Sequence, residues 1–297
     1  MVYKSARNLD FSIGDVPVQP LPDRVLFASP DYFNVKYVIN PHMEGHIGEV
    51  DVDEAQREWN RLRTAYDGLG LDTHVVPARP GLPDLVFCAN QTLPYLSKND
   101  DSKGVVLSRM FAVQRRDEVP FLAEFFSNLG YDVLDDLIDE NTSFEGMGDA
   151  LWHPGRRLLW GGYGYRTSAG AYDVISDRLD VDVLLLQLED PDFYHLDTCF
   201  CPLNESSVLI WPGAFTDEGV ALIEAVFEHV LEAPEDESRS LFACNAHCPD
   251  GRNVVIQRGC SKTTAMLRSA GFVPVEVDTG EFLKSGGSVF CMKQMFW

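Results

Sequence analysis

The feature that most constrains the fold is an alternation of short apolar runs with amphipathic segments along almost the whole chain. Runs such as 25–28, followed at once by turn residues, are typical of buried strands. The segment 53–69 carries apolar residues at steps of three and four, which predicts a helix that begins after Asp51 or Asp53. Strands are expected at 25–28, 84–90, 105–109, 157–161, 183–188, 207–211, 254–257 and 288–292, and helices at 53–69, 121–129, 171–179, 216–231 and 263–270. The alternation predicts an α/β fold.

The domain organisation follows from the continuity of this pattern. No low-complexity linker divides it, so residues 24–297 are expected to form a single domain, with residues 1–23 as an N-terminal arm laid on it. The order strand, strand, helix, strand recurs, but it does not separate a doubly wound sheet from a propeller of ββαβ modules. No Gly-x-Gly-x-x-Gly turn or Walker loop is present, so nucleotide-binding folds lose support.

Charge and composition narrow the classes of partner. The 297 residues include 46 acidic and 24 basic side chains, a formal net charge of −22, which argues against nucleic acid. An acidic field attracts cationic substrates, but net charge bears first on solubility, and we favour that second interpretation. No apolar run reaches the roughly 18 residues of a membrane span, and no secretory signal opens the sequence. We therefore expect no membrane contact and a cytoplasmic protein.

The cysteines bear on redox state and on metal binding. Seven cysteines, an odd number in a long chain, argue for reduced thiols rather than a disulfide framework. Cys244 and Cys248 flank His247 and suggest a zinc site, but no second pair has a matching spacing. We therefore expect no metal, and buried or incidental thiols at these positions.

Cys291 follows the glycine-rich turn Lys284-Ser-Gly-Gly287 near the end of the sequence. A thiol after such a turn is accessible in a way that a thiol in the middle of a helix is not. A cysteine with a distant histidine in an intracellular chain is a candidate nucleophile. A lone cysteine is more often a small buried hydrophobe, however, so this position does not decide the matter alone.

Two other segments carry acid–base side chains. If residues 194–198 form a strand, His195 and Asp197 project from one face, where histidine can transfer protons and a carboxylate can hold a cation. Glu145 lies in the glycine-punctuated turn 144–149, where backbone can approach a ligand closely. Taken singly, a structural histidine and a solvated acidic turn explain these segments equally well or better.

Polar residues at the ends of expected strands form a last group. Asn40, Asn90, Arg109 and Arg166 belong to it. Two arginines can clamp a substrate carboxylate through bidentate hydrogen bonds. Each residue by itself is better explained as a surface or structural side chain.

In their order along the chain, these segments resemble the guanidine-modifying superfamily of arginine deiminases, dimethylarginine dimethylaminohydrolases, amidinotransferases and arginine dihydrolases. The resemblance runs from about Val25 to Cys291. It rests on Asn-Pro-x-Met, Phe-x-x-Asn, Phe-Glu-Gly-x-Gly-Asp, Gly-x-Arg-Thr, His-Leu-Asp and Lys-Ser-Gly-Gly-x-x-x-Cys. It implies a five-bladed α/β propeller (pentein) of ββαβ units, and a hydrolase of the C–N bonds of linear guanidines that needs no cofactor.

The resemblance also implies a role for each reactive residue. Cys291 matches the nucleophile, His195 the general acid and base, and Glu145 the carboxylate that orients the histidine. Asp197 matches a carboxylate that holds the guanidinium nitrogens. We expect Cys291, His195 and Glu145 to be the catalytic residues and Asp197 to bind the substrate.

Four further residues are expected to bind the substrate. Arg109 and Arg166 match positions that hold its α-carboxylate. Deiminases usually have an aspartate where Asn90 stands, and Asn90 with Asn40 resembles the cyanobacterial-type arginine dihydrolases, which convert arginine to ornithine, ammonia and carbon dioxide. An asparagine amide can donate to the oxygen of a citrulline ureido group, whose lone pairs two carboxylates would repel. We therefore expect a second round of attack by Cys291.

Several alternatives stay open. An arginine deiminase or dimethylarginine dimethylaminohydrolase would stop at citrulline, and an amidinotransferase would need an amine acceptor. A non-catalytic binding protein of the same fold would have lost the Cys–His–Glu set. A metal hydrolase built on His195, Asp197 and Cys199 would lose activity to a chelator. The expected partner is a small guanidine such as arginine, and the sequence leaves the oligomeric state, a homo-oligomer included, open.

Overall fold

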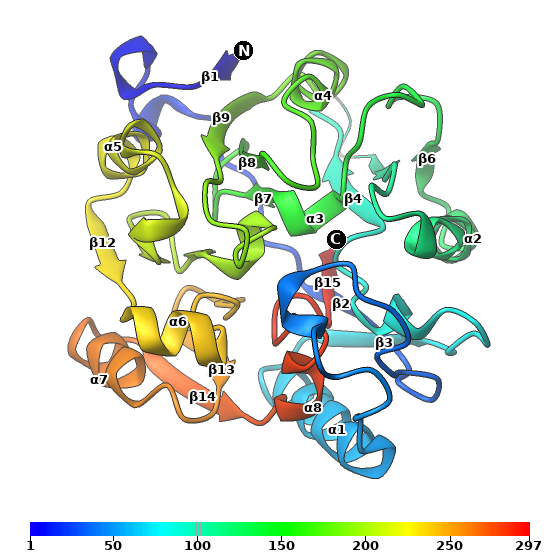
Figure 1. Cartoon of the computed structure of the whole chain (residues 1–297). Coiled ribbons are helices and arrows are strands. Elements are labelled where there is room, and N and C mark those ends of the chain that lie inside the picture. Colours follow the sequence, from blue (N-terminus) through cyan, green and yellow to red (C-terminus); the bar gives the residue numbers. More distant parts are fainter. Residues whose placement is uncertain (99, 101) are drawn as a thin grey trace.

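A computed structural model describes residues 1–98, 100 and 102–297. Within these residues the strands form five small sheets. The sheets lie around the middle of the molecule, and the longer helices lie on its outside (Figure 1). The α/β class expected from the sequence is confirmed.

Four of these sheets share one connection pattern. In each, a strand pairs antiparallel with a second strand, which is followed by a helix and by a third strand that pairs in parallel with the second. In one of the four, the first strand comes from the end of the chain. A helix joins the parallel neighbours because such strands need a crossover connection. The elements, in that order, are β15 (Gln294–Phe296), β2 (Arg24–Ala28), α1 (Val52–Gly68) and β3 (Asp72–Val76); β4 (Thr92–Leu96), β5 (Lys103–Leu107), α2 (Val119–Asn128) and β6 (Asp132–Leu134); β7 (Ala150–Trp152), β8 (Leu158–Tyr163), α4 (Ala171–Leu179) and β9 (Asp182–Gln187); and β10 (Phe200–Pro202), β11 (Ser207–Ile210), α5 (Asp217–Val226) and β12 (His229–Glu232).

The remaining sheet follows the same plan with one strand fewer. β13 (Asn253–Gln257) and β14 (Val273–Val277) pair in parallel and are joined by α7 (Ser261–Ser269). His247 forms an isolated antiparallel bridge to Val255, at the side of β13 where the other sheets have a third strand. Three short helices lie in connections: α3 (Gly146–Asp149), α6 (Glu235–Leu241) and α8 (Gly280–Leu283).

Residues 1–23 contact the rest of the chain through backbone groups. β1 (Val2–Tyr3) pairs in parallel with β9. The amide of Gln19 donates to the Gly155 carbonyl at 3.0 Å, and Trp297 Nε1 donates to the Pro20 carbonyl at 2.8 Å. The N-terminal residues therefore lie against both the β7–β9 sheet and the C-terminus.

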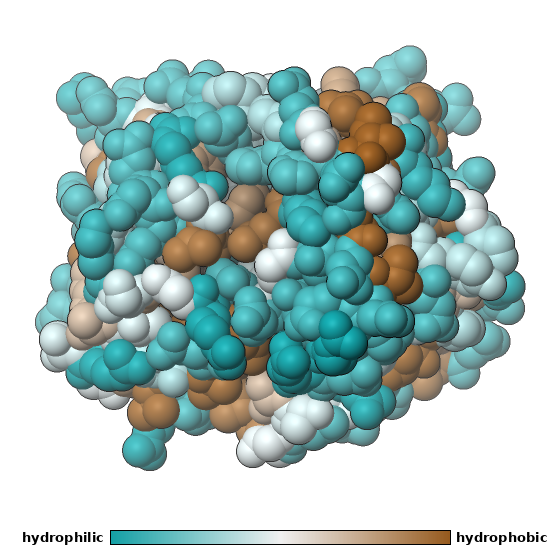
Figure 2. All heavy atoms as spheres, turned by 60° about the horizontal axis from the view of Figure 1, so that its bottom comes forward, coloured by the Kyte–Doolittle hydropathy of each residue, from teal (hydrophilic) through white to brown (hydrophobic). Residues whose placement is uncertain are grey.

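The strands of the β7–β9 sheet are buried on both faces, which explains their continuous apolar sequence. Trp160 and Leu184 are fully buried, and the Trp160 ring stacks on Phe227 at a centroid distance of 5.3 Å. The face of the molecule in Figure 2 is mostly hydrophilic, with small separate apolar areas, in keeping with the acidic composition. No helix in the described ranges is both long and apolar enough to cross a membrane.

The expected helices at 53–69 and 171–179 are confirmed as α1 and α4. Asp51 caps α1 by accepting the Glu54 amide at 2.9 Å, which is the first of the two expected caps. The helix expected at 216–231 begins after Thr216, as predicted, but ends at Val226. Its last expected residues form β12, because Phe227 takes an extended backbone conformation and its ring packs into the core.

Two expected strands are wrong, for one physical reason. Residues 84–90 form a 3-10 turn, η4 (Pro83–Val86), followed by a loop, and 288–292 is a turn that precedes β15. Both segments are buried and apolar, as a strand would be, but their backbone groups bond to side chains. Arg115 donates to carbonyls of the first segment, and Asn245 accepts amides of the second.

Replacing Leu184 with alanine is expected to lower the free energy of unfolding by about 2–5 kcal/mol, because it leaves a cavity between fully buried neighbours. Urea-induced unfolding followed by tryptophan fluorescence measures this change. Val174 on α4 is 42% exposed, so Val174→Ala is the matched control and should change stability by less than about 0.5 kcal/mol. Equal losses in the two variants would contradict the assignment of the core.

Candidate active site

Cys291 lies in the turn before β15 and is 3% exposed. The side chain of Asn245 holds this turn. Its Oδ1 accepts the backbone amides of Ser288 at 3.0 Å, Phe290 at 3.2 Å and Cys291 at 3.4 Å. Its Nδ2 donates to the Cys291 sulfur at 3.2 Å. One asparagine thus replaces strand pairing here and fixes the position of the thiol.

Asp197 faces this thiol. Cys291 Sγ donates to Asp197 Oδ2 at 3.2 Å, while Oδ1 is buried and has no hydrogen-bond partner among the described residues. Burial raises the pKa of Asp197 to about 7. Burial and the neighbouring Asp197 charge hold the pKa of Cys291 well above its ordinary value. These effects favour the protonated sulfur, and one carboxylate oxygen of Asp197 remains for a cation.

His195 and Glu145 form a second buried pair. The distance from His195 Nε2 to Glu145 Oε2 is 2.7 Å, and Glu145 Oε1 accepts the Phe111 amide at 2.9 Å. Burial raises the pKa of Glu145, but the hydrogen bond and charge of His195 and the charge of Arg166 outweigh it and bring the pKa to about 2. The ionised carboxylate therefore holds the imidazole in one orientation.

Residues 194–198 do not form a strand. His195 is the N-cap of a 3-10 helix, η6 (Leu196–Thr198). His195 and Asp197 therefore do not share a face of a strand: the imidazole meets Glu145, and the carboxylate meets Cys291. The short helix still points both side chains into one region, which a period-two pattern could not establish.

The short helix α3 lies between Glu145 and His195 in the sequence. Gly146 takes a φ of +51°, and a Cβ added there would lie 2.6 Å from the Thr92 carbonyl oxygen. A Cβ added at Gly148 would lie 2.3 Å from Asn90 Nδ2 and 3.3 Å from the His195 ring. The two glycines are therefore required by close packing of this turn against Asn90 and His195.

Asn90 is held at one end of its amide. Its Oδ1 accepts from Arg115 Nη1 at 2.8 Å. Its Nδ2 is buried and has no partner in the described part of the chain, and it lies beside Gly148 and His195. A buried hydrogen-bond donor is therefore left unused next to Gly148.

Asn40 lines the same pocket, but its amide is engaged at both ends. Its Oδ1 accepts the amides of His42 at 3.0 Å and Met43 at 3.3 Å, which caps η3 (Pro41–Met43). Its Nδ2 donates to the Ser285 carbonyl at 3.0 Å. The two asparagines are therefore not equivalent, and only Asn90 keeps a free donor.

Arg166 reaches the pocket and is 5% exposed. Its Nη1 lies 3.4 Å from Glu145 Oε2, and its Nη2 donates to the Ile39 carbonyl at 2.6 Å. Its guanidinium carbon lies 4.7 Å from the centre of the Tyr194 ring. Arg166 thus adds positive charge beside the His195–Glu145 pair.

Arg109 is not brought to this pocket. Its guanidinium donates to the carbonyls of Ile138 at 3.0 Å and Asp135 at 2.7 Å, and it lines a separate surface hollow. The expected pair of carboxylate-binding arginines is therefore not assembled here, because carbonyls of the 135–138 segment hold one member. Arg115 is the guanidinium that accompanies Arg166 in the pocket lining.

Lys293 follows Cys291 by two residues, and a role for it was not expected from the sequence. It is fully buried, its Nζ lies 3.2 Å from the centre of the Phe290 ring, and it has no hydrogen-bond partner among the residues described. Burial lowers its pKa to about 7, against the opposing effects of Asp197 and nearby thiols. The ammonium in turn lowers the pKa of Asp197.

Asp84, Arg115 and Asn245 also belong to this arrangement and were not predicted. Asp84 and Arg115 line the pocket, and Arg115 forms a buried ion pair with Glu118 at 2.9 Å. The one available signal was the spacing of three residues between Arg115 and Glu118. Such a spacing is also typical of a solvated helical pair, so it could not reveal burial.

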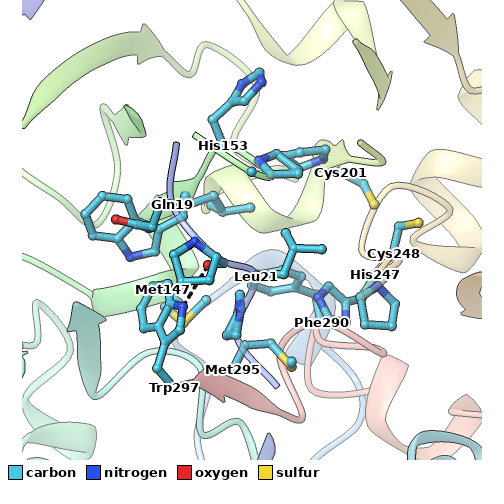
Figure 3. A pocket seen from close by; sticks show the side chains of 18 residues that line it. Gln19, Leu21, Met147, His153, Cys201, His247, Cys248, Phe290, Met295 and Trp297 are labelled. Atoms are coloured by element: carbon cyan, nitrogen blue, oxygen red, sulfur yellow. Dashed lines mark hydrogen bonds between the residues drawn. The ribbon is translucent and has the colours of Figure 1, made fainter. Parts of the chain in front are cut away.

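Phe290 and Met147 are among the residues that line a second pocket (Figure 3). His247 and Cys248 line it, and Cys248 and Cys244 belong to one apolar cluster. His247 Nδ1 lies 3.0 Å from the Tyr66 hydroxyl. In the described ranges, no group of three or more His, Cys, Asp or Glu is placed so that it could hold a metal ion.

Known proteins of similar sequence and structure are consistent with the site described above. The family described as "N,N dimethylarginine dimethylhydrolase, eukaryotic" matches residues 40–296. The chain belongs to this family. The membership of the guanidine-modifying superfamily that the sequence predicted is confirmed.

Two curated relatives illustrate the range of activities. The bifunctional arginine dihydrolase/ornithine cyclodeaminase AgrE of Nostoc sp. is 38% identical over 91% of this chain and 37% of its own length. The N(G),N(G)-dimethylarginine dimethylaminohydrolase of Mycobacterium tuberculosis is 35% identical over 92% of this chain and 85% of its own length. The chain thus spans little more than a third of AgrE, but most of the mycobacterial protein.

Solved structures agree on the fold. The N-terminal domain of ArgZ, an arginine dihydrolase from the ornithine–ammonia cycle in cyanobacteria, was crystallised with its product. It is 34% identical and superposes with a TM-score of 0.85 over 93% of this chain and 97% of that domain. A dimethylarginine dimethylaminohydrolase adduct with S-methyl-L-thiocitrulline superposes with a TM-score of 0.77 at 22% identity, which shows the shared fold alone.

Replacing Lys293 with methionine is expected to move the acidic limb of kcat/KM toward higher pH by roughly half a unit. We expect this limb near pH 7, because cation binding needs ionised Asp197, whose pKa is raised to about 7. Activity then falls as the pH falls through this value, and loss of the Lys293 charge raises the pKa further. The measurement is kcat/KM against pH with a guanidine substrate. Lys284 forms a surface pair with Glu281, so Lys284→Met should leave the limb in place; an unmoved limb in Lys293→Met would count against the electrostatic coupling.

Replacing Gly148 with alanine is expected to lower kcat by about 100-fold, because the new methyl group displaces Asn90 and His195 from their present positions. Steady-state kinetics together with thermal unfolding separate this effect from loss of fold. Gly68 ends α1, and a Cβ added there meets nothing within 4 Å. Gly68→Ala should keep full activity, and a fully active Gly148→Ala variant would show that this turn does not pack against the site as described.

Proposed function

We propose that this chain hydrolyses L-arginine to ornithine, ammonia and carbon dioxide through a covalent intermediate on Cys291. The observation that carries the proposal is the Asn90 amide, whose Nδ2 is a buried and unused donor beside His195. A guanidinium has only donors and gains nothing from such a group. A ureido group has a carbonyl oxygen that accepts from it. The similarity to AgrE and ArgZ supports the same reaction.

In the first round, the arginine guanidinium takes the free Oδ1 of Asp197. Its positive charge offsets the Asp197 charge that raises the pKa of Cys291, so the sulfur passes its proton to His195 and attacks the guanidinium carbon. A C–S bond forms, a C–N bond breaks, and His195 gives a proton to the departing ammonia. Water, deprotonated by His195, then adds to the thiouronium carbon and expels the thiolate, which leaves citrulline.

In the second round, Asn90 Nδ2 donates to the ureido oxygen and keeps citrulline in the pocket. Cys291 attacks the ureido carbon, a second ammonia departs, and the carbon stays bonded to sulfur and to the ornithine nitrogen. Water then breaks the C–S bond and leaves a carbamate of ornithine, which loses carbon dioxide. The two rounds consume two water molecules and account for all atoms of arginine.

A second candidate function is hydrolysis of N,N-dimethylarginine to citrulline and dimethylamine. The family description and the mycobacterial relative favour it, and so does Asn40, whose amide is engaged at both ends and is not free to hold a ureido oxygen. We rank it second, because a reaction that ends at citrulline has no use for the unpaired donor of Asn90. Release of dimethylamine from N,N-dimethylarginine identifies it directly.

We also propose that the five sheets are the blades of a five-bladed α/β propeller, formed by residues 24–297 as one catalytic domain with residues 1–23 as an arm. The recurring ββαβ order supports this assignment. All seven cysteines are free thiols, which supports the cytoplasm as the location. Arg109 is proposed to join Arg166 at the substrate α-carboxylate only after its bonds to the 135–138 carbonyls are broken.

Incubation with arginine is expected to release ornithine and two equivalents of ammonia, with little citrulline. Replacing Asn90 with aspartate should lower the ratio of ornithine to citrulline about tenfold or more, because the donor to the ureido oxygen is lost and a carboxylate repels that oxygen. The first round should persist, since a carboxylate suits the guanidinium. Amino-acid analysis and an ammonia assay on the same samples measure both rounds.

Two controls complete this experiment. Cys291→Ala should release no ammonia, because it lacks the sulfur that forms the covalent intermediate. Asn60→Asp changes an exposed asparagine on α1 in the same way and should keep the wild-type product ratio. Citrulline as the sole product of the wild-type chain, or an unchanged product ratio in Asn90→Asp, would overturn the dihydrolase proposal.

A further inference from the structure

The orientation of the Asn90 amide decides whether the site offers a donor or an acceptor to the substrate. An asparagine side chain has the same shape after a half-turn about its last bond, so its neighbours select which end faces the pocket. Arginine has five N–H donors and no acceptor. The contact of Arg115 Nη1 with Asn90 at 2.8 Å therefore requires the amide oxygen on that side and leaves the NH₂ group beside His195.

The guanidinium of Arg115 forms hydrogen bonds through all three of its nitrogen atoms. It is 4% exposed. Its Nε and Nη2 donate to Glu118 Oε2 at 3.0 Å and 2.9 Å, and Nη2 donates also to the carbonyls of Asp84 and Phe87, both at 3.1 Å. These three residues fix the plane of the guanidinium, and Nη1 is directed at Asn90.

The carboxylate that anchors Arg115 is equally constrained. Glu118 is fully buried, and its Oε2 accepts from Gln91 Nε2 at 2.6 Å. Gln91 is adjacent to Asn90 in sequence, so the contacts that run from Gln91 through Glu118 and Arg115 return to the same segment at Asn90. A buried guanidinium with such a fork geometry is rigid, because it cannot turn without breaking several charge-assisted bonds.

We propose that Arg115 is a positioning residue that determines the product of the reaction, by holding the Asn90 amide with its NH₂ group toward the substrate. The inference rests on the proposed function. With Arg115 in place, the site gains a bond to the ureido oxygen in the second round. With the amide free to turn, its oxygen accepts from the guanidinium instead, which favours arginine binding and weakens the hold on citrulline.

Replacement of Arg115 by lysine tests this assignment. Lysine keeps the positive charge that Glu118 requires, but a single ammonium cannot replace the planar fork. We expect the ratio of citrulline to ornithine released from arginine to rise about tenfold, the equivalent of one hydrogen bond. The ratio is set in each turnover and does not depend on how much of the protein is folded. Arg115→Gln, a neutral replacement, should shift the ratio in the same direction.

Arg157 provides a matched control. It is a buried arginine whose guanidinium donates to the Leu96 carbonyl at 2.7 Å and the Leu179 carbonyl at 2.5 Å, away from the pocket. Arg157→Lys should lower the temperature of unfolding as Arg115→Lys does, but its product ratio should equal that of the wild type. A purely structural role for Arg115 predicts the same unchanged ratio in both lysine variants.

Binding to the inactive enzyme gives a readout free of catalysis. Isothermal titration of Cys291→Ala with arginine and with citrulline is compared with the same titrations of Cys291→Ala/Arg115→Lys. We expect the affinity for citrulline to fall about tenfold, while the affinity for arginine stays the same or rises. Equal losses for both ligands would overturn the inference.

The outcomes also separate this inference from the proposed function. Wild-type protein that releases ornithine, with an unchanged ratio in Arg115→Lys and Arg115→Gln, overturns the role of Arg115 and leaves the dihydrolase proposal standing. Wild-type protein that releases only citrulline overturns the dihydrolase proposal. It also overturns the role of Arg115 in product choice, because a correctly held amide would then have failed to retain citrulline.

Discussion

The antiparallel pairing of β15 with β2 joins the last strand of the chain to one of its first. Cys291 comes three residues before β15, so this pairing draws the thiol against the segment that carries Asn90. The contact is direct, since the Ala89 amide donates to the Cys291 carbonyl at 3.3 Å. The C-terminal strand β15 thus completes the sheet of β2 and β3, and Cys291 lies where the two ends of the chain meet.

Buried charged side chains around Cys291, such as Glu145 and Arg115, have partners that compensate for the loss of water. Removing a charge from water is costly, so buried ions need opposite charges or several hydrogen bonds. Glu145 has His195 and a backbone amide, and Arg115 has Glu118 and two carbonyls. These groups form a rigid polar frame, arranged before any substrate arrives, in which the effective dielectric constant is low.

Within this frame, a few polar atoms are buried without a hydrogen-bond partner among the described residues. Asp197 Oδ1 and Asn90 Nδ2 have no partner among the described residues. Asp197 Oδ1 is an acceptor suited to a cation such as a guanidinium. Asn90 Nδ2 is a donor suited to a carbonyl oxygen such as that of a ureido group. Lys293 Nζ is unpaired as well, but it lies over the Phe290 ring, where it acts on Asp197 through its charge.

The sequence by itself determined the features that depend on neighbouring residues. The periodicity of α1 and α4 and the caps at Asp51 and Thr216 were sufficient, because a helix is stabilised by contacts three and four residues apart. The ordered motifs also pointed to the family, since they record the chemistry of each segment. Only the tertiary structure decided which partner each polar group meets. Arg115 and Arg109 are similar in sequence terms, yet one binds Asn90 and the other binds backbone carbonyls. The buried runs that resemble strands became turns for the same reason: side chains from distant segments satisfy their backbone groups, and no local pattern records such contacts.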